Sequence, residues 1–196
     1  MSDARVIVIG GSAGALDGLA VILAALPATF AIPIVVVVHL APNPPNVVPA
    51  ALERATSLRV VEIEDKLPLV SASVYVAPPN YHVLLERDAS LALSIDAPVH
   101  FSRPSIDVLF ESAAAAFGPA VVGVLLSGAN EDGALGLWHI AEAGGISIVQ
   151  DPATARHAVM PMAGVAQLHT RARVLAAGKI ASYLVGCSIE SCGERA

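Results

Sequence analysis

The feature that most constrains the fold is a short aliphatic run, residues 6–9, that leads directly into Gly10-Gly11-Ser12-Ala13-Gly14. Such a run predicts a buried strand, and the glycines allow a sharp turn into the apolar-periodic stretch 16–26, which predicts a helix. Ser12 is therefore expected at a strand-to-helix corner. There the free N–H groups of a helix start can stabilise negative charge that develops on an oxygen.

This position of Ser12 allows three interpretations. The serine can cap the helix, belong to a phosphate-binding turn, or act as a nucleophile. The segment lacks the Gly-x-Gly-x-x-Gly spacing of dinucleotide-binding folds and the Gly-Lys-Ser/Thr of phosphate loops, which argues against nucleotide binding. The turn alone does not choose between the cap and the nucleophile.

Two further aliphatic runs end at residues with catalytic potential. The run 34–38 is followed by His39, and the run 121–126 leads into Ser127-Gly128-Ala129-Asn130-Glu131-Asp132-Gly133. Taken alone, His39 is more typical of a structural histidine, and Asp132-Gly133 of a turn. In a parallel sheet, however, the carboxyl ends of the strands share one edge, where open α/β folds bind ligands. Together, Ser12, His39 and Asp132 are therefore predicted to form a catalytic triad.

The rest of the chain continues the alternation of strands and helices. This pattern predicts an α/β fold with a doubly wound, mostly parallel sheet and helices on both faces, in a Rossmann-like three-layer arrangement. Residues 83–86 and 91–95 flank Arg87-Asp88-Ala89-Ser90 and predict a small β-hairpin insertion. The expected strands are residues 5–10, 34–39, 59–62, 74–77, 121–126 and 146–149, and the expected helices are residues 16–25, 45–55, 105–117 and 134–143.

The composition fits one aliphatic domain. A chain of 196 residues with 55% hydrophobic and 4% aromatic residues predicts a single domain over residues 1–196, with a core over about 5–187 and a frayed polar tail after Ser188. Prolines and His39 interrupt the longest apolar stretches, so no membrane insertion is expected. The first residues show no signal-like segment, which predicts a cytoplasmic protein.

Charge and histidine spacing restrict the partners and cofactors. The net charge of −6 and the scattered positions of the 11 basic residues argue against nucleic-acid binding. The 6 histidines show no metal-ligand spacing, so neither a metal nor another cofactor is expected.

Short motifs follow one another in order between residues 6 and 164. They are Ile9-Gly10-Gly11-Ser12-Ala13-Gly14, Val38-His39-Leu40-Ala41-Pro42, Tyr75-Val76-Ala77-Pro78-Pro79-Asn80-Tyr81-His82, Arg103-Pro104-Ser105-Ile106-Asp107-Val108-Leu109-Phe110, Leu126-Ser127-Gly128, Asp132-Gly133 and Met160-Pro161. As an ordered set they resemble the catalytic domain of bacterial chemotaxis protein-glutamate methylesterases of the CheB type.

The resemblance implies a role for each candidate residue. Ser12 corresponds to the nucleophile, His39 to the base and Asp132, rather than its neighbour Glu131, to the acid that orients the histidine. Family members hydrolyse methyl esters on glutamate side chains in the cytoplasmic domain of chemotaxis receptors, and some also deamidate receptor glutamines.

The chain departs from the family pattern around these residues. Well-known members carry Ser-Thr-Gly-Gly where this chain has Ser12-Ala13-Gly14-Ala15, and a methionine of the oxyanion region where it has Ala129. The resemblance thus assigns Ala13 and Ala129 to the oxyanion region, where a backbone N–H donor would tolerate either side chain. A catalytically weak signalling or binding module that retains the fold is the alternative hypothesis.

Arg103 precedes Pro104 and the predicted helix cap Ser105. It is either an exposed loop arginine or a residue that meets the acidic receptor surface or the substrate backbone. His82 and His100 could line the same cleft, but the structural interpretation is favoured for each, because no step of the chemistry requires a second histidine. Many members begin with a phosphorylatable receiver domain, for which residues 1–4 leave no room, so the expectation is constitutive activity or control by a separate regulatory protein docking over Ser12 and Arg103.

Overall fold

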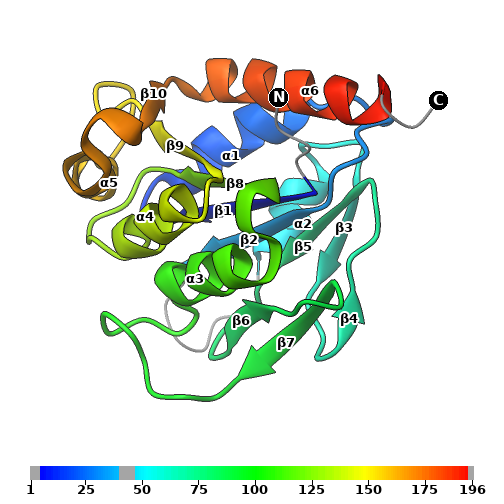
Figure 1. Ribbon diagram of the computed structural model, residues 1–196, viewed down its shortest axis with the longest axis horizontal. Coiled ribbons are helices and arrows are strands. Elements are labelled where there is room, and N and C mark those ends of the chain that lie inside the picture. Colours follow the sequence, from blue (N-terminus) through cyan, green and yellow to red (C-terminus); the bar gives the residue numbers. More distant parts are fainter. Residues whose placement is uncertain (1–4, 40–46, 194–196) are drawn as a thin grey trace.

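Seven parallel strands form one sheet in the order β10-β9-β8-β1-β2-β5-β3, with helices on both faces (Figure 1). The structure, a computed structural model, describes the backbone of residues 5–39 and 47–193 and the side chains as far as Ser188. The predicted doubly wound, three-layer α/β fold is confirmed. Its strands are β1 (Val6–Gly11), β2 (Ile34–Val38), β3 (Arg59–Glu62), β5 (Ser73–Val76), β8 (Val121–Leu125), β9 (Ile146–Gln150) and β10 (Arg173–Leu175).

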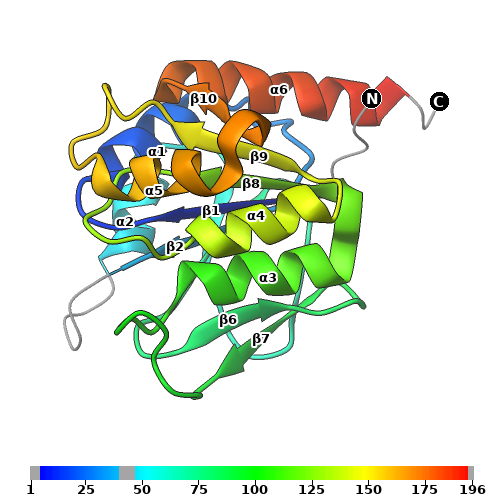
Figure 2. The same ribbon diagram turned by 60° about the vertical axis from the view of Figure 1, so that its left-hand side comes forward.

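The helices lie in two layers around the sheet. Alternate strand residues point to opposite faces, and both sets are buried. Ile7 and Ile9 of β1 belong to the apolar cluster with α1, α2 and α6, whereas Val6 and Val8 belong to the cluster with α3, α4 and α5, which lie in front of the sheet in Figure 2. The helices are α1 (Ala15–Ala24), α2 (Val48–Glu53), α3 (Ile106–Phe117), α4 (Ala134–Glu142), α5 (Val159–Leu168) and α6 (Ala177–Gly193), with short 3-10 helices η1 (Gly118–Ala120) and η2 (His169–Arg171).

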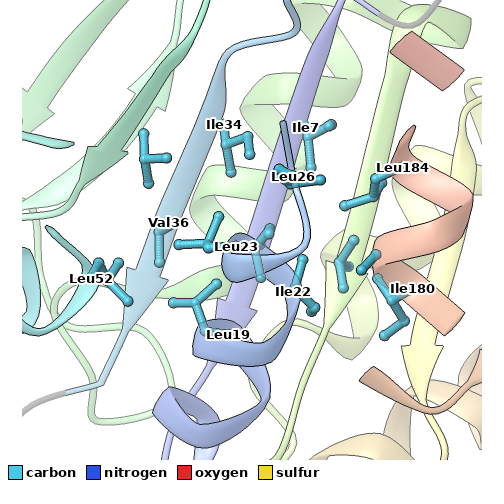
Figure 3. Close-up of a cluster of buried hydrophobic side chains, with 14 of the residues drawn as sticks. Ile7, Leu19, Ile22, Leu23, Leu26, Ile34, Val36, Leu52, Ile180 and Leu184 are labelled. Carbon is cyan, nitrogen blue, oxygen red and sulfur yellow. The ribbon is translucent and has the colours of Figure 1, made fainter. Parts of the chain in front are cut away.

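The layer around α1 holds the long C-terminal helix in place. Figure 3 shows Ile22 of α1 on the side of the α6 residue Ile180, and Leu19 and Leu23 on the side of Val36 of β2. Ile7, Ile34 and Leu184 belong to the same cluster. All of these side chains are fully buried. Because the full burial of one such side chain is worth about 1.5–3 kcal/mol, the few contacts of α6 are enough to attach it to the sheet.

The central position of β1 places its carboxyl end at a reversal of strand order. From β1 the chain adds β2, β3 and β5 on one side of the sheet and then returns to add β8, β9 and β10 on the other. Open α/β sheets bind ligands at the carboxyl edge beside such a reversal.

A second, antiparallel sheet covers the outer side of α3. The predicted hairpin forms its strands β6 (His82–Leu85) and β7 (Ser90–Ser94), and β4 (Leu67–Pro68), which was not predicted, pairs with β7. Val83 and Leu91 share an apolar cluster with Phe110 of α3, and Figure 2 shows β6 and β7 beneath that helix.

Three elements near the end of the chain were not predicted. They are α5, β10 and α6, and α6 continues through Ser188, after which a frayed tail was expected, to Gly193. The physical reason for α6 is the helical spacing of Ile180, Leu184 and Cys187, all buried. Residues 45 and 46 of the second predicted helix, and the motif residues Leu40-Ala41-Pro42, lie outside the described residues.

Within the part of the chain that the structure describes, no helix combines the length and apolar character needed to cross a membrane.

Candidate active site

Ser12 lies directly beyond the carboxyl end of β1, between the ends of β2 and β8. The backbone pairing of β1 continues to this point on both sides: the Ser12 N–H donates to Ser127 O at 2.9 Å, and the His39 N–H donates to Gly11 O at 3.1 Å. The residue that caps α1 is Gly14, not Ser12, so the interpretation of Ser12 as the helix cap is wrong. The half-buried serine is held at the edge of the sheet by backbone bonds.

Two glycines allow this corner to form. Gly14 has φ 75°, the left-handed conformation that favours glycine, and a Cβ atom there would lie 2.7 Å from the Arg156 side chain. At Gly10, a Cβ atom would overlap the Ile106 side chain at the start of α3. A side chain at either position would therefore displace the turn that carries Ser12 or the helix packed beside it.

His39 and Asp132 form a hydrogen-bonded pair beside the end of β1. His39 follows β2, Asp132 precedes α4, and the distance between His39 Nε2 and Asp132 Oδ2 is 2.8 Å. The structure therefore brings together the two residues that the sequence analysis predicted as base and acid. Among the described residues, no hydrogen bond joins the Ser12 hydroxyl to His39, so Ser12 is linked to the pair through the backbone pairing of β1 and β2.

The Asp132 carboxylate is fully buried and surrounded by donors. Besides His39, Oδ2 accepts the N–H of Ile106 at 2.7 Å, and Oδ1 accepts the Ser105 hydroxyl at 2.9 Å and the N–H of Asp107 at 3.1 Å. Burial raises the pKa of Asp132, but the hydrogen bonds from His39, Ile106 and Asp107 outweigh it and lower the pKa below its ordinary value. Asp132 is thus an ionised acceptor at neutral pH.

Ser127 joins the loop after β1 to the loop between β9 and α5. Its hydroxyl donates to the Ala13 carbonyl at 2.8 Å and accepts the N–H of His157 at 2.9 Å, while its own N–H donates to Gln150 Oε1 at 3.0 Å. Neither the Ala13 N–H nor the Ala129 N–H donates a hydrogen bond within the described residues. Both predicted oxyanion residues therefore carry unused backbone donors on loops that leave adjacent strands.

A cavity of about 190 Å³ adjoins His39. His39, Asn80, Phe101 and Arg103 are among its lining residues. Arg103 is half-buried rather than fully exposed: its Nη1 donates to the carbonyls of Ile95 at 2.8 Å and Asp96 at 3.0 Å. Its Nε is buried and has no hydrogen-bond partner among the described residues.

Two other histidines near the site, His82 and His100, differ in their surroundings. His82 is buried, accepts the Ser105 N–H at Nδ1 and lies 3.2 Å from the Ala97 carbonyl through Nε2, which fits the structural interpretation. His100 is 40% exposed, and its Nε2 lies 3.4 Å from Asp107 Oδ2. The polar atoms of His100, Asp107 and Asp132 are close enough to consider a metal ion, but hydrogen-bond donors already occupy both oxygens of Asp132.

Several residues that shape this site were not identified from the sequence. Ser105 was identified only as a helix cap, which it is, since its hydroxyl accepts the Val108 N–H. Asp107 and Ser127 were named only as members of the family motifs, without a role, and Gln150 was not named. No local pattern reveals their roles, because each acts through a contact with a segment far away in the sequence.

A parallel α/β sheet with a serine, a histidine–aspartate pair and unused N–H donors at its carboxyl edge has the groups that serine hydrolases use. Comparisons with known proteins narrow this class. The model of the CheB methylesterase family matches residues 7–184, and the chain belongs to that family.

Individual relatives agree with this assignment. A protein from Leptospira interrogans, provisionally named a protein-glutamate methylesterase/protein-glutamine glutaminase, is 47% identical over 81% of this chain and 82% of its own. A protein-glutamate methylesterase/protein-glutamine glutaminase from Nocardioides sp. is 39% identical over 76% of this chain but only 42% of its own. The crystal structure of the Thermotoga maritima CheB methylesterase catalytic domain superposes with a TM-score of 0.88 at 29% identity and covers 93% of this chain and 98% of that one.

Proposed function

We propose that this protein is a protein-glutamate methylesterase that removes methyl esters from glutamate side chains of a chemotaxis receptor's cytoplasmic domain. The observation that carries the proposal is the 2.8 Å contact of His39 with Asp132 beside Ser12, in a chain of the CheB methylesterase family. The names of the relatives support the substrate class. The proposal places the activity in one cytoplasmic catalytic domain with its core at residues 5–187.

In the proposed mechanism Asp132 fixes which nitrogen of His39 acts. An ionised carboxylate can accept hydrogen bonds but cannot donate them. Nε2 of His39 must therefore carry the proton of the hydrogen bond to Asp132. Nδ1 is then the nitrogen that accepts the Ser12 proton as Oγ attacks the ester carbonyl. His39 passes this proton to the departing methanol, and water, activated by the same nitrogen, hydrolyses the glutamyl-Ser12 ester.

The proposed oxyanion donors are the N–H groups of Ala13 and Ala129. Backbone donors held by rigid loops can stabilise the negative oxygen whatever side chain they carry. The Ser127 hydroxyl supports this role because it holds the Ala13 carbonyl at 2.8 Å and thereby orients the turn. The replacement of the family's threonine and methionine by alanines is therefore compatible with activity.

The test is methanol release from a methylated receptor fragment by three purified proteins. The wild type and Ser182→Ala, a control on the exposed side of α6, are expected to release methanol at equal rates, whereas Ser12→Ala is expected to release none while still folding. Wild-type turnover by Ser12→Ala would contradict the assignment of the nucleophile. Receptor binding without methanol release by the wild type would favour the alternative, a binding module.

Deamidation of receptor glutamines is a second candidate activity, favoured by the glutaminase part of the relatives' names. The same serine and histidine would attack the amide, with ammonia as the leaving group. Ammonia release from a receptor fragment that carries glutamine at the methylation positions tests it. The same assay with an added candidate regulatory protein tests whether a separate partner docks over Ser12 and Arg103.

A further inference from the structure

A two-residue turn at the edge of the His39 cavity presents an aromatic side chain to solvent. Val99 and Ser102 exchange two backbone hydrogen bonds, of 3.1 and 2.8 Å, and the turn residues His100 and Phe101 have φ 48° and 59°. The Phe101 side chain is completely exposed, at 105% of its reference area. Phe101 also lines the cavity that contains His39 and Arg103.

The conformation of this turn is unusual for its residues. Two-residue turns with positive φ at both central positions favour Asn-Gly or Asp-Gly, because a bulky side chain is disfavoured in the left-handed region. Phe101 adopts this conformation without burying its ring against the rest of the protein. The packing of the fold therefore does not account for an aromatic residue here, and strained residues of this kind cluster at functional sites.

Hydrogen bonds of Arg103 fix the backbone on either side of the turn. Its Nη1 donates to the carbonyls of Ile95 and Asp96, which precede the turn, and its carbonyl accepts the N–H of Asn80 at 3.2 Å. His100 approaches Asp107 in α3 at 3.4 Å. These contacts fix the backbone of the turn, so only the side chain of Phe101 has to become ordered when it binds a partner.

Two further exposed apolar side chains lie on the segments that Arg103 connects. Ile95 is 73% exposed and Tyr81, next to Asn80, is 40% exposed. We refer to Tyr81, Ile95 and Phe101 as the apolar rim. Of the three, only Phe101 lines the cavity; Tyr81 follows the lining residue Asn80, and the Ile95 carbonyl accepts a hydrogen bond from the lining residue Arg103. Exposed apolar groups near a binding cavity are typical of surfaces that bind a partner.

We propose that Phe101 determines specificity for the polypeptide substrate: the apolar rim docks the receptor segment around the methylated glutamate, and Phe101 covers apolar side chains of that segment. This inference rests on the proposed function. The occupant is inferred from the cavity, because Phe101 and the proposed base His39 both line it. A polypeptide whose ester is held at His39 is long enough to reach Phe101, whereas a small ester is not.

The experiment compares two substrates, a methylated receptor fragment and phenyl acetate. The variant Phe101→Asn removes the aromatic ring. Because asparagine adopts positive φ angles more readily than phenylalanine, the melting temperature of the variant is expected to equal or exceed that of the wild type. The ratio of kcat/KM for the receptor fragment to kcat/KM for phenyl acetate is expected to fall about tenfold, mainly through KM. Phe101→Leu, which keeps an apolar side chain, is expected to retain most of the ratio.

Val70→Asn is the matched control, because Val70 is 51% exposed and precedes the opposite, amino end of β5. It is expected to leave both rates unchanged. An unchanged ratio in Phe101→Asn, with methanol release by the wild type intact, would overturn this inference alone. Absence of methanol release by the wild type would overturn the proposed function and this inference with it.

Discussion

Asp132 and Asp107 are both buried carboxylates at the junction of α3 and α4, yet their surroundings have opposite effects on their charge. The two sites are reciprocal: Asp132, just before α4, accepts N–H groups from the start of α3, and Asp107 in α3 accepts the N–H of Gly136 in the first turn of α4 at 2.7 Å. Each carboxylate thus satisfies donors of the neighbouring helix. The positive end of a helix dipole stabilises the negative charge of the carboxylate at both positions.

The number of donors makes the difference. Asp132 is bound by His39, Ser105, Ile106 and Asp107, and its pKa is lowered, whereas burial raises the pKa of Asp107 to about 6 despite the Gly136 N–H. The negative charge of Asp132 contributes to this increase. Burial alone therefore does not decide whether a carboxylate in this core is ionised.

The largest effect is expected from Asp132→Asn. Asparagine cannot accept hydrogen bonds at both side-chain atoms and does not stabilise the working tautomer of His39, so kcat for methanol release should fall about 10³–10⁴-fold. The matched control is Glu131→Gln, which makes the same charge change at the exposed neighbouring residue and should retain activity. An equal fall in kcat in the two variants would contradict the assignment of Asp132 as the residue that orients His39.

The next effect concerns stability and pH at Asp107. The pKa of Asp107 is higher in the folded protein than its ordinary value of 3.8, so folded protein binds this proton more tightly. The contribution of Asp107 to the free energy of unfolding therefore falls as the pH rises from about 3.8 to about 6, by at most about 3 kcal/mol. Asparagine never ionises and avoids this loss.

Asp107→Asn should consequently gain stability relative to the wild type at pH 7.5 but not at pH 4. Urea unfolding of both proteins at the two pH values measures the difference. A stability difference that does not depend on pH would contradict the prediction. It would show that neighbouring groups offset the effect of burial on the pKa of Asp107.

A smaller effect is expected from Ser105→Ala. The substitution removes one donor to Asp132 and the cap of α3, and should lower the free energy of unfolding by about 1–2 kcal/mol. Because His39, Ile106 and Asp107 remain as donors, activity should fall much less than in Asp132→Asn. Ser182→Ala is the control for loss of a hydroxyl from a helix, and equal stability of the two variants would contradict the prediction.

The smallest effect is expected from His100→Asn. The imidazole contacts Asp107 at 3.4 Å but is 40% exposed, so solvent screens the pair and its contribution should not exceed about 0.5 kcal/mol. A double-mutant cycle of His100→Asn and Asp107→Asn measures the coupling energy. A coupling energy of about 2 kcal/mol or more would mean that His100, rather than the contacts between α3 and α4, determines the protonation state of Asp107.

The sequence predicted the sheet and the edge where the candidate residues meet because both depend on local patterns. Aliphatic runs such as Val6–Gly11 and Ile34–Val38 are recognisable as buried strands, and a parallel arrangement brings their carboxyl ends together. The proximity of His39 and Asp132 follows from that topology. The family motifs added the roles of these residues.

The rest depends on contacts that local patterns do not contain. The Ser105 hydroxyl reaches Asp132 and the Ser127 hydroxyl reaches Ala13 only after distant segments have packed together. The turn at His100 and Phe101 has positive φ angles but lacks the Asn-Gly pair that is typical of such turns, so it was not predicted from the sequence. Helix α6 was missed although Ile180, Leu184 and Cys187 have helical spacing.

The central position of β1 has a consequence for the order of events in folding. His39 and Asp132 are separated by 93 residues, and neither can meet the other until β1 has paired with both β2 and β8. Long-range parallel pairing is slow compared with the formation of helices and hairpins. During refolding we expect esterase activity to return later than helical circular dichroism, so that catalysis itself reports when the sheet is complete.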